Sequence, residues 1–154
     1  MITLWRSLNS LLDNVASIFA DVLLLAMRLW WGWQFFQTGK GKLLDLDNKT
    51  EFFASLHLPF PKFNVILAGS TECFGGLLLL IGLFARPVCV PLIFTMVVAY
   101  LTADIDAVKG IFQEPDKFTD AAPFLFMLTA MIVFAFGPGR VSVDQLIGRG
   151  AKKR

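Results

Sequence analysis

Apolar residues along the chain are gathered into four blocks, which charged and turn-forming residues separate. The blocks cover about residues 21–38, 63–85, 87–103 and 121–138. At a helical rise of about 1.5 Å per residue, segments of about 20 residues can cross the roughly 30 Å hydrocarbon core of a bilayer. The pattern therefore predicts four transmembrane helices.

The first twenty residues follow a different pattern. Their apolar residues recur at the spacing of one helical face, and they are Leu4, Leu8, Leu11, Leu12, Val15 and Phe19. The continuous apolar run of a signal peptide is missing, because polar residues interrupt the segment. We expect residues 1–20 to form an amphipathic helix that lies in the membrane interface before the first span.

The connections between the blocks indicate how the spans are arranged. Only Arg86 and Pro87 separate the second and third blocks, so these spans form an antiparallel hairpin. The connections of residues 39–62 and 104–120 then lie at one end of the bundle. The first of them contains a short helix, for which Thr50 has the position of an N-cap.

The C-terminal segment adds one more helix. Ser142 and Gln145 have the spacing of a capping box at the start of the basic tail, residues 145–154. The sequence thus predicts an all-α integral membrane protein. A four-helix transmembrane bundle of residues 21–144 follows the amphipathic helix and precedes the tail.

Composition agrees with a place in the lipid bilayer. Hydrophobic residues make up 56% of the 154 residues, the mean hydropathy is +0.65, and charged residues reach only 17%, against about 25% in soluble domains. A net charge of +2 gives no sign of a nucleic-acid partner, and the basic tail fits contact with anionic lipids better.

Positive charges near the spans set the expected orientation. The side of the two termini carries seven, namely Arg6, Arg86, Arg140, Arg149, Lys152, Lys153 and Arg154. The opposite side carries six, namely Lys40, Lys42, Lys49, Lys62, Lys109 and Lys117. The excess of one predicts that both termini are cytoplasmic.

Arg28 and Glu72 are the charged residues set deep within the predicted spans. Counted from the ends at Thr38 and Phe63, they lie about 15 Å and about 13.5 Å from the same membrane surface. A lone charge at this depth costs several kcal/mol, so such residues face the bundle interior and pair. We therefore predict an Arg28–Glu72 ion pair.

Small residues surround both members of the predicted pair. Those near Glu72 are Ala68, Gly69, Gly75 and Gly76, and Gly32 follows Arg28 by one helical turn. Small side chains let membrane helices approach closely. The pair could line a pocket for a substrate, a quinone head group or a proton path, or it could fix two helices in register. Gln34 and Gln37 are secondary polar candidates.

The sequence gives little sign of a disulfide, a metal or haem site, or a catalytic nucleophile. Cys73 and Cys89 are about 16 Å apart in predicted depth, too far for a disulfide. His57 is the only histidine, which leaves a zinc or bis-histidine haem site without ligands. We predict no metal site, and no nucleophile with an adjacent base is evident.

Four segments in the same order resemble the DoxX family of small four-span membrane proteins. They are RLWWGWQFFQTGKGK (28–42), FFASLHLPFP (52–61), ECFGGLLLLIGLFAR (72–86) and GPGRVSVD (137–144). The resemblance implies a bacterial or archaeal inner (plasma) membrane protein, related to a subunit of a quinone-linked oxidoreductase. The family-like polar residues are Arg28, Lys42, Glu72 and Arg86.

The leading hypothesis is an accessory membrane subunit of a redox system, acting with a redox partner protein and holding a small lipophilic ligand such as quinone near Arg28 and Glu72. An alternative is a small transporter or proton-conducting protein with an acidic mouth of Asp104, Asp106 and Asp120. A homo-oligomer would give such a path the room that four spans lack. A third alternative is a structural scaffold without activity of its own.

Overall fold

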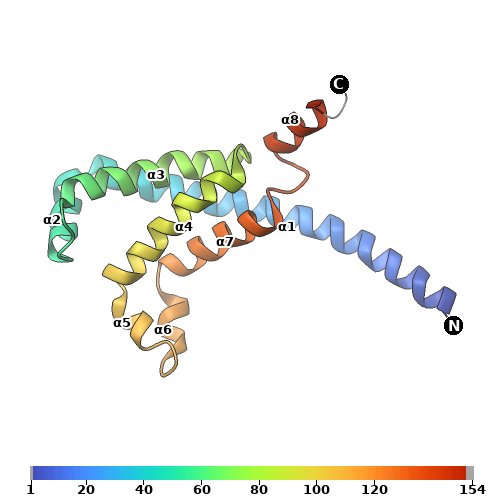
Figure 1. Cartoon of the computed structure of the whole chain (residues 1–154), viewed down its shortest axis with the longest axis horizontal. Helices are drawn as coiled ribbons and strands as arrows, with labels where there is room; N and C mark the ends of the chain where they lie inside the picture. Colours follow the sequence, from blue (N-terminus) through green and yellow to red (C-terminus); the bar gives the residue numbers. More distant parts are fainter. Residues whose placement is uncertain (1, 152–154) are drawn as a thin grey trace.

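The computed structural model describes residues 2–151, which form helices joined by short connections (Figure 1). The helices are α1 (Ile2–Leu44), α2 (Leu46–Ser55), α3 (Pro61–Ile81), α4 (Ala85–Thr102), α5 (Ile105–Lys109), α6 (Pro115–Asp120), α7 (Pro123–Phe136) and α8 (Val143–Ala151). No strand occurs in this part of the chain. The prediction of an all-α membrane bundle is confirmed.

Within residues 2–151, three helices, α1, α3 and α4, are long and apolar enough to cross a membrane. The fourth apolar block forms α7, whose 14 residues cover only about 21 Å. Pro123 sets the start of this helix, and Gly137 ends it with a φ of 84°. The structure thus has three helices of spanning length and a shorter apolar one, where the sequence predicted four spans.

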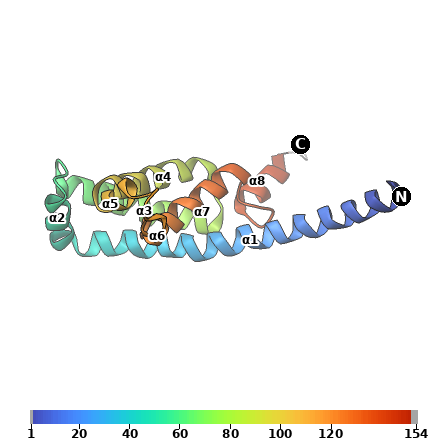
Figure 2. The same cartoon turned by 90° about the horizontal axis from the view of Figure 1, so that it is seen from below.

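Helix α1 is longer than predicted at both ends. It runs without a break through residue 20, where we expected an interfacial helix to end, and beyond Thr38 to Leu44. Figure 2 shows it along one side of the other helices, with its N-terminal part projecting past them. Helix α2 also begins early, at Leu46, so Thr50 lies inside it rather than at its N-cap.

Glycines explain the close antiparallel packing of α1 on α3. Gly32 and Gly39 face Gly69 and Gly76, and both pairs have a spacing of seven residues. A Cβ atom on Gly32 would lie 2.9 Å from the Leu80 backbone nitrogen, so the two backbones nearly touch. The predicted small-residue contact is confirmed for these glycines, whereas Gly75 faces Leu92 of α4.

The core lies where α1, α3, α4 and α7 meet. Its fully buried side chains include Phe35, Leu79, Leu92 and Val133. Phe35 also meets the edge of Phe126, with ring centroids 4.7 Å apart. Ala85, Cys89 and Ala130 are also fully buried in this cluster, and their small side chains let the helices converge closely.

The two ends of the bundle carry different structures. Helices α2, α5 and α6 lie toward one end, and the α3–α4 turn lies toward the other with the segment that leads to α8 (Figure 1). The predicted capping interaction is present, since the Gln145 backbone N–H donates to the Ser142 hydroxyl at 3.3 Å. Cys73 and Cys89 are both free, as predicted.

Candidate functional site

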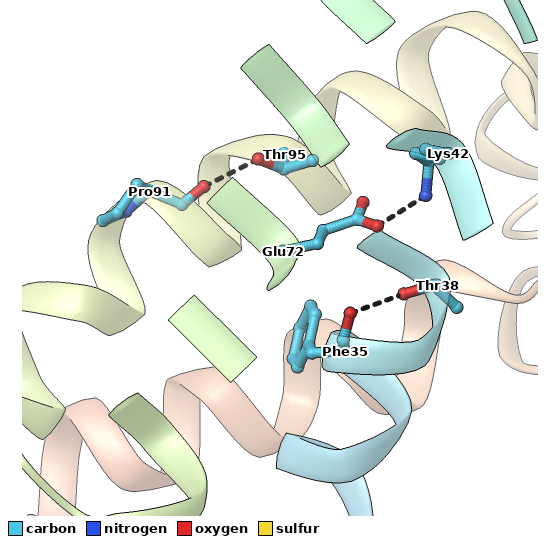
Figure 3. Close-up of polar contacts among 6 residues, drawn as sticks. All are labelled: Phe35, Thr38, Lys42, Glu72, Pro91 and Thr95. Carbon is cyan, nitrogen blue, oxygen red and sulfur yellow. Dashed lines mark hydrogen bonds and ion pairs between the residues drawn. The ribbon is translucent and has the colours of Figure 1, made fainter. Parts of the chain in front are cut away.

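Glu72 pairs with Lys42 and not with Arg28. Its carboxylate Oε2 lies 2.5 Å from the Lys42 Nζ atom, which donates a hydrogen bond to it (Figure 3). The Glu72 side chain is 2% exposed and that of Lys42 is 23% exposed. The predicted Arg28–Glu72 ion pair is therefore wrong in its partner, although both residues are buried inside the bundle as predicted.

The register of α1 on α3 explains this error. Gly39 lies against Gly69 and Cys73, which puts Glu72 level with the last turns of α1. Arg28 instead lies against Gly82, ten residues beyond Glu72 and so about 15 Å further along α3. Our depth estimate ended the first span at Thr38, but α1 continues to Leu44. Lys42, which we counted as a loop residue, is thereby brought onto Glu72.

The Lys42–Glu72 pair borders a cavity of about 230 Å³ near the end where α2 and α5 lie. Most of its walls are apolar and come from α2 and its C-cap, α4 and α7. They include Phe52, Phe53, Leu56, Met96, Ala99 and Phe126. Its polar side chains are Thr38, Lys42, Glu72, Thr95, Thr102 and Asp104. Gln34, Gln37 and Arg86 are not among the lining residues.

All three threonine hydroxyls that line the cavity donate hydrogen bonds to the backbone, Thr102 to the Val98 carbonyl at 2.7 Å. Thr38 donates to the Phe35 carbonyl at 3.0 Å and Thr95 to the Pro91 carbonyl at 2.9 Å (Figure 3). The ion pair has capacity left, because a lysine ammonium has three donors and Lys42 uses one. Among the described residues, Glu72 Oε1 receives no hydrogen bond. The pair can therefore offer both a donor and an acceptor to a bound molecule.

Arg28 lies toward the opposite end of the bundle, beside Gly82 and Val141. Its Nη2 atom donates to the Val141 carbonyl at 2.5 Å, and the residue is 1% exposed. Nε and Nη1 have no hydrogen-bond partner within the described chain, and Nη1 occupies the space where a Cβ on Gly82 would lie. Arg28 thus holds the segment of residues 137–145, here named the C-terminal strap.

Two aspartates also anchor the strap. Asp144 accepts hydrogen bonds from the backbone N–H groups of Phe84 and Ala85, at 2.8 and 2.9 Å, and so caps α4. Asp21 accepts from the Arg140 backbone N–H at 2.9 Å and lies 3.3 Å from its Nε atom. Sequence reasoning missed both residues. The only signal was that Asp144 closes the GPGRVSVD segment.

The remaining candidates lie away from the cavity. Gln34 is partly buried, and Gln37 is exposed on α1. Arg86 is exposed beside the strap, where its Nη2 atom donates to the Ala135 carbonyl at 3.4 Å. Within residues 2–151, no group of three His, Cys, Asp or Glu side chains is placed to hold a metal ion.

Comparisons with known proteins point to one family. The DoxX family model matches residues 23–105, which contain Arg28, Lys42 and Glu72. The chain is 28% identical over 143 residues to an uncharacterized protein of Haemophilus influenzae, covering 87% of this chain and 89% of that protein. It is 27% identical over 128 residues to a Bacillus subtilis protein named "Putative oxidoreductase CatD", covering 83% of this chain and 89% of that protein. No solved structure matches.

Proposed function

The chain belongs to the DoxX family of multi-pass membrane proteins, and from this premise we propose that it is an accessory subunit of a membrane redox system. In this proposal it holds the head group of a small lipophilic molecule in the cavity beside Lys42 and Glu72. The observation that carries the proposal is a buried ion pair on the wall of an otherwise apolar cavity.

The energetics of the ion pair support a role in binding. A buried salt bridge gains little net stability over apolar packing, because desolvation of both charges offsets their attraction. Ionisable groups within membrane segments are accordingly rare outside functional sites. Thr38 and Thr95 surround the pair with satisfied hydroxyls, so Lys42 and Glu72 are the groups best placed to recognise a polar head group.

A quinone head group suits this arrangement. Its carbonyl oxygens accept hydrogen bonds, as from Lys42, and its reduced form donates from hydroxyls, as to Glu72 Oε1. A cavity of about 230 Å³ is smaller than the roughly 300–1,000 Å³ of sites that enclose drug-sized ligands. It would hold a single ring, while an isoprenoid tail would remain in the lipid.

The redox assignment draws support from the relative that is named as an oxidoreductase. The two cysteines, Cys73 of α3 and Cys89 of α4, form no Cys-x-x-Cys redox motif. We therefore assign electron transfer to a partner protein and ligand positioning to this chain. We place the protein in the inner membrane of a bacterium, with cytoplasmic termini and the cavity toward the opposite side.

The test is to purify the protein in mild detergent and to identify its bound lipophiles by extraction and mass spectrometry. Wild type is compared with the Lys42→Gln, Glu72→Gln double variant, which leaves no unpaired charge, and with the matched control Gln37→Ala on the same helix. We expect quinone to copurify with wild type and the control and to be lost from the double variant. Absence of a quinone from folded wild-type protein would refute the proposed ligand.

A titration identifies the site directly. Trp31 lies against Phe126, with ring centroids 4.9 Å apart, and Phe126 lines the cavity. A short-chain benzoquinone in the cavity should therefore quench tryptophan fluorescence with saturation in wild type and in Gln37→Ala. Equal saturable quenching in the double variant would show that the pair takes no part in binding.

A further inference from the structure

The N-terminal part of α1 leaves the bundle without a partner. Both views show it projecting beyond the end that carries the strap (Figures 1 and 2). Its large apolar side chains are 48–67% exposed, namely Leu11, Leu12, Val15, Ile18, Phe19, Val22 and Leu23. The Arg140–Asp21 ion pair marks the level at which α1 leaves the bundle. An exposed apolar surface of this length marks a site of contact with a protein or with the membrane.

Four of these exposed residues, Leu11, Val15, Ile18 and Val22, have the spacing of a coiled-coil seam, and Leu12 and Phe19 flank it. Steps of four and three residues alternate from Leu4 to Leu29, through Leu8, Leu11, Val15, Ile18, Val22 and Leu25. This is the 3.5-residue average repeat that keeps one helical stripe facing a partner helix over several turns. The polar residues Asp13 and Ser17 fall outside the seam.

Helix geometry favours a partner helix over the membrane surface. To lie flat in the interface, the segment would have to turn away from the direction of the span. Instead α1 is one continuous helix from Ile2 to Leu44, and the seam continues past Asp21 into the membrane part at Leu25 and Leu29. Continuous helices bend gently, and sharp kinks need a Pro, a Gly or an inserted group. Residues 2–31 contain neither Pro nor Gly.

We propose that the covering partner is a second copy of this chain, with the two α1 helices packed in parallel along this seam. Copies with the same membrane orientation project their α1 helices on the same side, which makes the pairing parallel. The central a positions are Val15 and Val22, and the d positions Leu11 and Leu25 carry leucine, a combination typical of two-stranded coiled coils. Leu8 and Leu29 at a and Ile18 at d depart from it.

The available area agrees with a stable dimer. If the seam residues Leu11, Val15, Ile18, Val22 and Leu29 and the flanking Leu12 and Phe19 each bury about 100 Å², each copy buries about 700 Å². This is close to the roughly 800 Å² per partner of standard interfaces. The seam lies away from the cavity, since none of its residues is among the cavity lining. This inference therefore stands independently of the proposed ligand.

Single cysteines test the pairing in native membranes. The parent carries Cys73→Ala and Cys89→Ala, and Val15→Cys and Ile18→Cys place one thiol on the seam. The matched controls, Ala16→Cys and Ala20→Cys, place it on other faces of the same helix. Residues at a and d positions face their own copies across a parallel two-fold axis, so mild oxidation should convert Val15→Cys and Ile18→Cys to disulfide dimers, with little product from the controls.

Three outcomes would overturn the proposal. Equal cross-linking at all four positions would indicate random collision. No cross-linking, with thiols that remain reactive, would show that no second copy covers the seam. No cross-linking, together with quenching of a label at residue 15 by nitroxide lipids, would identify the bilayer as the covering surface. A Val15→Asp, Ile18→Asp variant should also lose the dimer in light scattering while keeping its helical content.

Discussion

Lys42 reaches from the last turn of α1 to Glu72 in the middle of α3, with Nζ 2.5 Å from Oε2. The contact depends on Gly39, which lets the two backbones meet one turn before Lys42. A larger residue at position 39 would separate the helices and lengthen the ion pair. The glycine contact and the cavity pair are therefore parts of one arrangement.

Substitution of Gly39 tests this dependence, and Gly41 provides a control two residues away. A Cβ on Gly39 would overlap the Cys73 and Gly69 backbones, whereas one on Gly41 has nothing within 4 Å. We expect Gly39→Ala to destabilise the protein by about 1–3 kcal/mol, as overpacking does. Gly41→Ala should be neutral or stabilising by up to about 1 kcal/mol. Unfolding in detergent measures both, and equal effects would show that the backbones are not in contact.

Loss of Arg28 should free the C-terminal strap. Because Arg28 holds the Val141 carbonyl, Arg28→Ala should increase hydrogen exchange across residues 137–145 and expose Arg140 to trypsin. Arg86→Ala is the control, since Arg86 is exposed and makes one long hydrogen bond of 3.4 Å. If the strap of Arg28→Ala stays protected from hydrogen exchange and trypsin, contacts other than that of Arg28 hold it in place.

Asp144 should stabilise the protein by capping the N-terminus of α4, although it lies far from α4 in the sequence. Asp144→Ala leaves the Phe84 and Ala85 N–H groups without their acceptors, a change that costs about 0.5–2 kcal/mol at N-caps. Asp144→Asn keeps an acceptor oxygen and should retain most of the stability. Thermal unfolding of the two variants separates hydrogen bonding from charge. Equal losses would mean that the negative charge dominates.

Local features of the fold could be predicted from the sequence. The α3–α4 hairpin was predicted from Arg86 and Pro87, which alone separate two apolar blocks, and the Ser142 cap was predicted from a short-range motif. The end of α1 could not be predicted in this way, because the Gly-Lys-Gly-Lys run after Thr38 is typical of a helix end in water. In this bundle Gly39 is instead a packing position inside the helix.

The sequence also could not predict which residues Arg28 and Glu72 contact, because this depends on how α1 and α3 are aligned. Glu72 and Arg28 were both expected to be buried, and both are. Their pairing depends on the register of two helices, and Arg28 lies ten residues, or about 15 Å, from the level predicted for it on α3. Asp144 meets the α3–α4 turn across 60 residues of chain, a contact that no local pattern encodes.

The most direct test is a pair of double-mutant cycles that share Glu72. One cycle combines Glu72→Gln with Lys42→Met and the other combines it with Arg28→Met, and the free energy of unfolding is measured in detergent for every variant. We predict a coupling energy of about 1–3 kcal/mol between Lys42 and Glu72, and additivity within about 0.5 kcal/mol for Arg28 and Glu72. Strong coupling of Glu72 to Arg28, with none to Lys42, would contradict the structure's assignment of Glu72 to the cavity and of Arg28 to the strap.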